Sequence, residues 1–215
     1  MMMQKKELNS HEEKSMVHAV TTVKALPVAE PAALGLFGLA VAALVLASTD
    51  LKLAMSTAKS LMIPWVLFFG ATAQLVAGTM EFKRNNIFGA TVFSVYAMTM
   101  YSIALTLFIT IFTGVVFDIT HYAYGLIGIL IFSIIATVAS VMTNKTFFAI
   151  LIAVDLAVLL LIPHYLFEMS AQPAGVFLLL TSVLSFYGAA AILLNTMAGK
   201  TILPLGKALW VPVKK

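Results

Sequence analysis

Residues 30–36, with the sequence EPAALGL, mark the point where this chain of 215 residues changes from a polar, charged tail to an almost continuously apolar sequence. Pro31 has no backbone N–H and a fixed φ, so it suits the first turn of a helix, where that N–H would have no partner. Glu30 places a negative charge at the positive end of the helix dipole. No charged residue follows as far as Ser48. We therefore predict that a first membrane-spanning helix begins here. The residues leave open whether its entrance is only a capped helix start or also meets a ligand.

The composition identifies an integral membrane protein. Hydrophobic residues make up 61% of the chain and charged residues 10%, whereas a soluble domain carries roughly 25% charged residues. A chain with so few charges cannot cover a surface that faces water. It has no cysteines, which excludes disulfides, thiolate metal sites and thiol catalysis. The net charge of +4 does not indicate nucleic-acid binding, because the charges lie at the ends of the apolar segments, where membrane topology explains them.

Six apolar segments approach the length of about 20 residues that a helix needs to cross the hydrocarbon core of a bilayer. We predict an all-α integral membrane protein with six transmembrane helices in a compact bundle. An N-terminal tail at 1–29 precedes the transport domain at 30–198, and a C-terminal tail at 199–215 follows it. The predicted spans are 31–48, 61–80, 87–113, 122–142, 146–162 (ended by Pro163) and 174–196. The short links at 81–86 and 143–145 require the helices that they join to run antiparallel.

The basic residues are distributed unevenly between the two sides that six spans define. One side holds the tails and the links 81–86 and 143–145, and it carries eleven lysines and arginines. These are Lys5, Lys6, Lys14, Lys24, Lys83, Arg84, Lys145, Lys200, Lys207, Lys214 and Lys215. The other side carries only Lys52 and Lys59. Because cytoplasmic loops of membrane proteins are enriched in Lys and Arg, we predict a multi-pass protein of the plasma membrane with both termini in the cytoplasm.

The second predicted span carries Gly70, Gln74 and Gly78 on one face, at steps of four residues. Small residues at this spacing let a second helix backbone approach closely, which indicates a packing role for Gly70 and Gly78. The amide of Gln74 lies between them and needs a partner. Two interpretations stay open, a hydrogen bond between helices and an amide that faces a pore and binds a carboxyl group.

The third predicted span is rich in hydroxyl groups. Four of them at i+3 and i+4 spacing predict a stripe that faces water better than lipid, namely Ser102, Thr106, Thr110 and Thr113. Each hydroxyl alone often bonds a carbonyl one turn earlier in its own helix. The span also carries Tyr96, whose hydroxyl is placed to face a channel or a neighbouring helix. The Ser and Thr residues of this span are Thr91, Ser94, Thr99, Ser102, Thr106, Thr110 and Thr113.

Asp155 is the one acidic residue deep inside a predicted span. A charge there costs at least ~2.5 kcal/mol, so Asp155 should face the bundle interior. A structural hydrogen bond to a neighbouring hydroxyl and a role in proton coupling both fit. Glu30 and Glu81, near the cytoplasmic ends of spans, are further candidates for the mouth or for proton coupling. No Lys or Arg lies inside a span, so an anion would meet neutral donors or helix N-termini, or would cross as the protonated acid.

The sequence shows no arrangement of residues typical of an enzyme or a metal site. The histidines are His11, His18, His121 and His164, and they are not clustered. Neither HExxH nor GxSxG occurs. We therefore expect no enzyme activity, no cofactor and no bound metal.

Three stretches resemble, in order and spacing, the motifs of the acetate uptake transporter family. Residues 30–36 resemble its NPAPLGL signature. Residues 70–91 resemble its second-helix and loop pattern, and residues 199–206, GKTILPLG, resemble its C-terminal end. The resemblance covers about residues 30–206. It implies six helices per subunit, a homo-hexamer with a path through each subunit, and passage of acetate and similar small carboxylates that is commonly described as proton-linked.

The resemblance also implies roles for individual residues. Tyr96 matches a tyrosine that lines the path, and Leu39 falls at an apolar constriction where a bacterial permease of the family has phenylalanine. Gln74 and Glu81 match their counterparts. Glu30 replaces the Asn of the signature and Ala33 replaces its second Pro, so the mouth is where this chain departs most from the family.

We predict a transporter or channel for acetate and related carboxylates in a lipid bilayer, with protons as a second candidate substrate. The residues leave open whether acetate moves as an anion or with a proton. The alternatives are a urea or short-amide channel of similar architecture, and a membrane sensor that moves nothing. The predicted substrate path is lined by Pro31, Leu34, Gly35, Leu39, Gln74, Tyr96 and Thr99.

Overall fold

The computed structural model describes residues 28–54, 56–114 and 118–211. All but two residues of the predicted N-terminal tail lie outside this part of the chain. The prediction of an all-α protein with six spans is confirmed, since the described residues contain six helices that are long and apolar enough to cross a membrane. They are Ala32–Asp50, Lys59–Lys83, Ile87–Phe112, Thr120–Ser140, Lys145–Phe167 and Gln172–Ala198.

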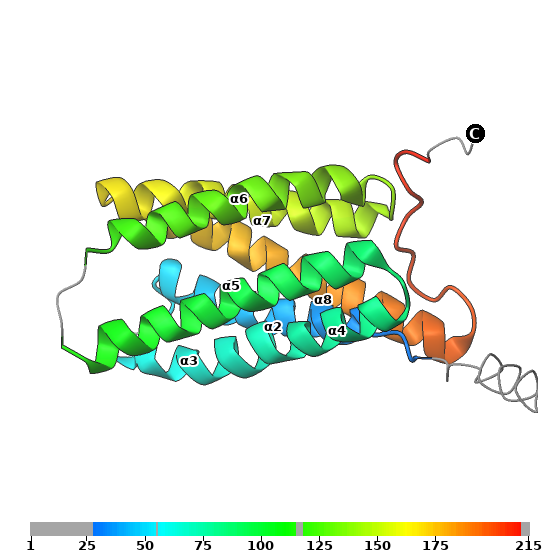
Figure 1. Cartoon of the computed structure of the whole chain (residues 1–215), viewed down its shortest axis with the longest axis horizontal. Helices are drawn as coiled ribbons and strands as arrows, with labels where there is room; N and C mark the ends of the chain where they lie inside the picture. Colours follow the sequence, from blue (N-terminus) through cyan, green and yellow to red (C-terminus); the bar gives the residue numbers. More distant parts are fainter. Residues whose placement is uncertain (1–27, 55, 115–117, 212–215) are drawn as a thin grey trace, which may run out of the picture.

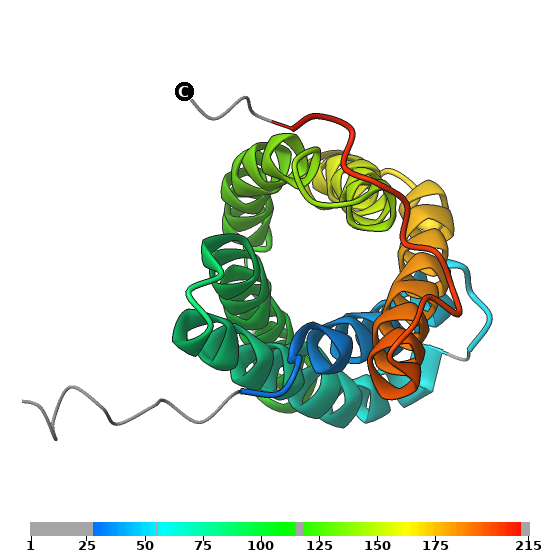
Figure 2. The same ribbon diagram turned by 90° about the vertical axis from the view of Figure 1, so that its right-hand side faces the viewer.

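The six spans lie side by side (Figure 1), and Figure 2 shows them arranged as a ring. The elements are α2 (Ala32–Asp50), α5 (Ile87–Phe112), α6 (Thr120–Ser140), α7 (Lys145–Phe167), α8 (Gln172–Ala198) and the composite second span. Around the ring α2 packs on α8, α8 on α7, α7 on α6, and the second span on both α5 and α2. The contact between α5 and α6 is the sparsest of the circuit. The first and last described residues lie at one end (Figure 1), which we call the proximal end; the opposite end is distal.

The second span is not a uniform α-helix. It consists of a 3₁₀ turn η1 (Ser56–Leu61), α3 (Met62–Trp65), a π-helical stretch η2 (Val66–Ala73) and α4 (Gln74–Lys83). A π-helix shifts backbone hydrogen bonds away from the α pattern. Two side chains bond carbonyls of this stretch, since Thr72 Oγ1 donates to the Leu67 carbonyl at 2.9 Å and Gln74 Nε2 donates to the Gly70 carbonyl at 2.6 Å.

Small residues allow α2 to pack closely against both neighbours. Ala40, Ala42 and Ala43 of α2 are almost fully buried. The hydroxyl of Ser182 in α8 donates to the Ala40 carbonyl at 2.8 Å, so the two backbones approach within the length of one side chain. Such close approach is the usual way in which helices associate where no hydrophobic effect operates between them.

The predicted end of the fifth span before Pro163 is wrong, because α7 continues one further turn to Phe167. Proline removes one backbone hydrogen bond, but neighbouring groups in a membrane bundle can compensate for that loss. Here the Tyr165 ring packs edge-on against Tyr122 of α6, with 4.7 Å between ring centroids. The helix ends at Glu168, whose φ of 54° is left-handed.

The segment after α8 crosses the proximal end as an ordered strap (Figure 1). The Thr146 N–H and hydroxyl both donate to the Leu205 carbonyl, at 3.1 and 2.9 Å. The N–H groups of Leu209 and Trp210 donate to the Val141 carbonyl. These bonds connect the strap to the α6–α7 hairpin, on the far side of the ring from the point where α8 meets α2.

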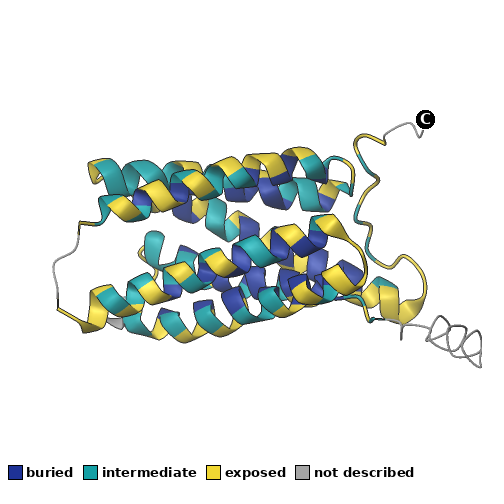
Figure 3. Cartoon of the chain, viewed as in Figure 1, coloured by how far each residue is buried: buried dark blue, intermediate teal, exposed yellow. Residues whose placement is uncertain are grey.

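Large apolar side chains are exposed along the outer faces of the helices, and Figure 3 shows exposed residues along the outside of α5 and α6. Phe68, Leu105, Ile135 and Val183 are each more than half exposed. In water such a surface would cause aggregation, whereas hydrocarbon solvates it. The interior of the ring, by contrast, contains polar groups.

We predict that Gly78→Ala destabilises the protein, because a Cβ there would lie 2.9 Å from the Ser94 backbone nitrogen and 3.3 Å from the Ala90 carbonyl oxygen of α5. Overpacking of this kind costs about 1–3 kcal/mol. The control is Gly128→Ala in α6, where a Cβ meets no atom within 4 Å. Alanine there gains up to about 1 kcal/mol of helix propensity. Thermal unfolding in detergent compares the two variants, and equal stability would contradict the close α4–α5 packing.

Candidate functional site

Two cavities lie on the axis of the ring, one toward each end. The distal cavity has a volume of about 360 Å³. Of the second span only Lys59 and Met62 contribute to its wall, and the other five spans all contribute to it. Its lining includes Leu39, Ala43 and Asp50 of α2, Tyr96, Thr99, Thr106 and Thr110 of α5, Tyr122 and Leu126 of α6, Val154, His164 and Tyr165 of α7, and Thr181 of α8.

The proximal cavity has a volume of about 560 Å³. It lies where the N-termini of α2, α5 and α7 meet the C-termini of α4 and α8. Its lining includes Glu30, Ala32, Glu81, Arg84, Asn86, Phe93, Asn144, Phe147, Asn195 and Leu205. Leu205 belongs to the C-terminal strap, so the strap forms part of this mouth.

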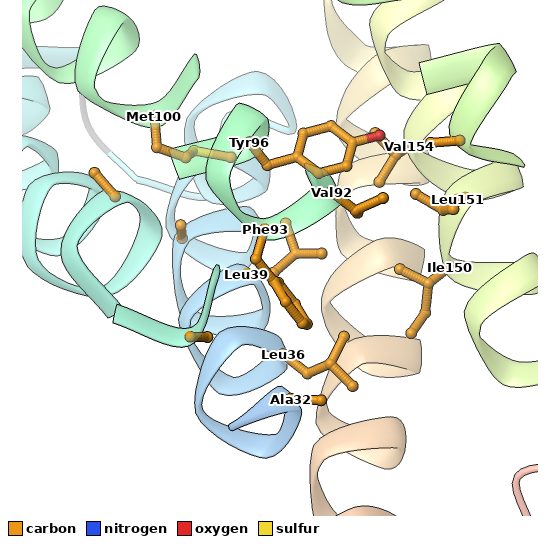
Figure 4. Close-up of a cluster of buried hydrophobic side chains, with 14 of the residues drawn as sticks. Ala32, Leu36, Leu39, Val92, Phe93, Tyr96, Met100, Ile150, Leu151 and Val154 are labelled. Atoms are coloured by element: carbon orange, nitrogen blue, oxygen red, sulfur yellow. The ribbon is translucent and has the colours of Figure 1, made fainter. Parts of the chain in front are cut away.

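An apolar barrier separates the two cavities. Figure 4 shows its side chains converging from α2, α5 and α7. Leu36, Leu39, Phe93, Ile150 and Val154 are each less than 10% exposed. Leu39 and Val154 border the distal cavity and Phe93 borders the proximal one. Leu36 and Ile150 pack against Gly188 of α8, where a Cβ atom would lie within 3.4 Å of both side chains. A solute moving along the axis must therefore displace a layer of close-packed apolar side chains.

A chain of hydrogen bonds lies beside this barrier and joins three helices. The Tyr96 hydroxyl of α5 lies 2.6 Å from the Ser133 Oγ of α6. Ser133 donates to Oδ1 of Asp155 in α7, and Thr137 donates to its Oδ2 at 2.7 Å. In Figure 4 the Tyr96 side chain reaches across from α5 to end beside Val154. The structural hydrogen bond that the sequence analysis considered for Asp155 is therefore present. Through Ser133 the same bonds also reach Tyr96, which lines the distal cavity.

Sequence reasoning singled out Asp155 and Tyr96 but missed Ser133 and Thr137. Their spacing of four residues on one helix was the available signal, because it places two hydroxyls on one face of the span. Because no Lys or Arg lies inside a predicted span, hydroxyl groups were the expected partners of Asp155. A single sequence does not identify which helix supplies them.

A cluster of charges surrounds the proximal mouth. Glu30 accepts a hydrogen bond from the Ala32 N–H at 3.3 Å and pairs with Arg84 at 2.5 Å. Arg84 also lies 3.8 Å from Glu81, which is fully buried and accepts from Asn86 at 2.9 Å. The hydrogen bond to Glu30 raises the pKa of the Arg84 guanidinium further above its usual range, so this group stays charged. Glu30 thus both caps α2 and neutralises the arginine.

The distal mouth carries a second set of polar groups that the sequence analysis did not select. Asp50, Lys59, His164, Tyr122 and Tyr165 all line the distal cavity. Asp50 and His164 lie at the C-terminal ends of α2 and α7, and their position just past predicted spans was the signal that could have found them. The distal mouth therefore carries ionisable groups, whereas the polar groups of the cavity wall nearer the barrier, Tyr96 and Thr99, are hydroxyls.

The remaining residues of the predicted path are not brought together. Pro31 and Gly35 are buried at the start of α2, and Gly35 lies under the Phe93 ring. Leu34 is 45% exposed on the outside of the bundle. Gln74 is fully buried in helix packing and lines neither axial cavity, and its Oε1 has no partner among the described residues. Leu39, Tyr96 and Thr99 do line the distal cavity.

The predicted hydroxyl stripe of α5 borders the distal cavity only in part, because Thr106 and Thr110 line it and Ser102 and Thr113 do not. Thr99, Thr106 and Thr110 border the distal cavity. Thr99 and Thr110 nevertheless donate to carbonyls of their own helix, at 3.0 and 2.8 Å. Ser102 is exposed and bonds the Met98 carbonyl in the same way. Thr99 and Thr110 therefore offer hydroxyl oxygens to the cavity while they donate their protons within the helix.

Comparison with known proteins gives three findings. Residues 13–206 match the sequence profile of the GPR1/FUN34/yaaH family. Acetate permease A of Emericella nidulans is 28% identical over 209 residues, which cover 89% of this chain and 70% of the permease. The solved structure of the bacterial acetate channel SatP superposes with a TM-score of 0.77 at 22% identity, over 84% of this chain and 100% of the channel chain. The last likeness shows the fold.

We predict that Arg84→Gln destabilises the protein by about 1–3 kcal/mol at neutral pH, because it leaves the buried Glu81 carboxylate and the neighbouring Glu30 without their cation. The loss should shrink as the pH falls, since proton uptake by the buried Glu81 carboxylate removes its uncompensated charge. Thermal unfolding in detergent across pH measures this. Lys83→Gln removes an exposed neighbouring cation and serves as the control. A deficit that does not depend on pH would show that Arg84 acts through packing alone.

Proposed function

Because the chain belongs to the GPR1/FUN34/yaaH family, we propose that it transports acetate and similar small carboxylates across a membrane along the axis of its helix ring. The observation that carries this proposal is the pair of axial cavities separated by one thin apolar barrier. Acetate is the substrate in the names of both the Emericella nidulans permease and the bacterial channel. Membrane transport is also consistent with a chain whose described part is almost entirely six apolar helices.

The barrier selects by size and hydration. Apolar constrictions exclude hydrated ions because the water shell cannot be replaced there. Acetate has one methyl group and one carboxyl group, so its methyl end can enter the layer of Leu39 and Phe93 while its carboxyl group meets hydroxyls. Tyr96 and Thr99 line the distal cavity and follow Phe93 by about one and two turns on the same helix. They would orient the carboxyl group as it approaches.

Transport is linked to protons in this proposal. Inside the ring, between the charged mouths, the wall of the distal cavity offers hydroxyls. The Asp155 carboxyl group is connected to this wall through Ser133 and Tyr96, and the Lys and Arg residues of the described spans lie at helix ends. An acetate anion in such a wall has no countercharge, and burying an uncompensated charge is costly. Passage together with a proton removes that cost, and Asp155 is the titratable group placed to carry it.

The lysine and arginine distribution supports a plasma-membrane orientation with the proximal end in the cytoplasm. Arg84, Lys145 and Lys200 lie at the proximal end and Lys52 and Lys59 at the distal end. By the positive-inside rule the proximal cavity is then the cytoplasmic vestibule. We further propose that subunits assemble as a homo-hexamer with one path each, on the family resemblance of residues 30–206.

Flux into proteoliposomes tests the proposed function. Purified protein should admit labelled acetate, and an inward proton gradient should accelerate the uptake. Propionate should compete with acetate and urea should not. Competition by urea instead would favour a urea or short-amide channel, which a wall of neutral hydroxyls also suits. Uptake no faster than in protein-free liposomes would overturn the transport proposal.

We predict that Leu39→Ala widens the barrier and admits longer monocarboxylates. The uptake of butyrate relative to acetate should rise by about 10-fold, since one methylene in an apolar pocket is worth roughly 1–3 kcal/mol. Leu44→Ala is the matched control, because Leu44 lies on the same helix but is 43% exposed on its outer face. An unchanged butyrate-to-acetate ratio in Leu39→Ala would place the constriction elsewhere.

A further inference from the structure

The hydrogen bonds from Tyr96 to Asp155 have a direction that depends on one proton. An ionised carboxylate only accepts hydrogen bonds, and a hydroxyl has one proton to donate. With Asp155 ionised, Ser133 gives its proton to Oδ1 and Thr137 gives its own to Oδ2. The Ser133 oxygen can then only accept from Tyr96, at 2.6 Å. Tyr96 therefore has no proton left for the cavity and presents only lone pairs there.

A proton on Asp155 reverses this order. The new O–H at Oδ1 donates to the Ser133 oxygen, and the Ser133 proton turns toward the Tyr96 oxygen. The Tyr96 O–H is then free to rotate toward the distal cavity, whose wall Tyr96 helps to form. Thr137 continues to donate to Oδ2. One proton has been added at Asp155, each hydroxyl has kept its own, and only rotations have occurred.

We propose that Asp155, acting through Ser133, switches the Tyr96 hydroxyl between hydrogen-bond acceptor and donor, so that a carboxylate is held at the barrier only when Asp155 carries a proton. This inference rests on the proposed function and gives it a mechanism of coupling. A carboxylate accepts hydrogen bonds, so it is repelled by lone pairs and held by a donated O–H. Each anion that binds at Tyr96 is then accompanied by one proton on Asp155.

The switch is local, because few other charged groups face Asp155. From α5 the titratable group is Tyr96 itself, and α6 contributes the two hydroxyls. The described sequence of α8, which packs on α7, contains no charged residue, and its Tyr187 donates to the Pro204 carbonyl in the strap. On α7 itself, Lys145 and His164 lie nine or ten residues away, roughly 15 Å along the helix.

The test compares acetate with acetamide, which has the same shape, donates N–H groups and does not titrate. Flux of both is measured in proteoliposomes over the widest pH range in which the protein stays folded, with the acetate anion concentration held constant and the flux of protein-free liposomes subtracted. In the wild type the acetate-to-acetamide ratio should fall by about tenfold as pH rises, which is the size expected for one hydrogen bond to a charged group.

Ser133→Ala cuts the connection between Asp155 and Tyr96, so this ratio should no longer change with pH. Asp155→Asn should also flatten the profile, because its side chain no longer gains or loses a proton. Ser133→Thr keeps the hydroxyl and should restore the wild-type profile. The matched control is Ser140→Ala on the same helix, where the serine is buried but bonds only the Thr137 carbonyl of its own helix; its profile should match the wild type.

The outcomes separate the two proposals. Absence of acetate flux in the wild type would overturn the transport function. Flux with a wild-type pH profile in Ser133→Ala or in Asp155→Asn would leave the function intact and overturn the switch. A profile lost in Ser140→Ala as well would show that packing of α6, and not the hydroxyl at 133, sets the pH response, which also overturns the switch. Thermal unfolding of each variant confirms that folded protein is compared.

Discussion

The carboxyl group of Asp155 is accepted inside an apolar bundle because hydroxyls of α6 bond both of its oxygens. An acid in a membrane span costs at least ~2.5 kcal/mol, and that cost is offset only if the partners are held in place. Ser133 and Thr137 meet this requirement from a neighbouring helix, and Tyr96 extends the bonds to a third. The contact between α5 and α6 is otherwise the sparsest in the ring, so these bonds also connect the two helices where packing contributes least.

The rest of the molecule can be understood around this polar chain. Close packing of alanines and glycines brings α2 against α8 and the second span, which leaves room on the axis for two cavities. The apolar layer of Leu36, Leu39, Phe93 and Ile150 divides them, and Tyr96 is the polar residue at that division. The charged groups that line the two cavities lie at the mouths, and Asp155 lines neither cavity. A wall of this kind favours small solutes that are neutral or that carry a proton with them.

The six-helix architecture could be predicted from the sequence, because a chain that crosses a bilayer must satisfy its backbone hydrogen bonds internally, and few structures do so. Runs of apolar residues, short links and the bias of Lys and Arg predicted six spans, and the structure has them. The predicted end of the fifth span at Pro163 was wrong. The prediction considered the missing N–H of the proline, but the packing of Tyr165 on Tyr122 cannot be read from the sequence. The site was harder to predict. Asp155 stood out as a lone acid, but its partners on α6 depend on how two helices face each other, and the π-helical turn that buries Gln74 has no signal in residue spacing.

In the proposed function the distal cavity is an aqueous chamber on the substrate path. The chain contains no cysteine, so one introduced thiol can be probed without background. Thr106→Cys places it in the wall of the distal cavity, and Leu44→Cys places it on the outer face of α2. A small water-soluble thiol reagent should modify Cys at 106 faster than Cys at 44, and acetate should slow only the former. Modification at 106 that is undetectable, or that is unaffected by acetate, would show that the distal cavity is not on the substrate path.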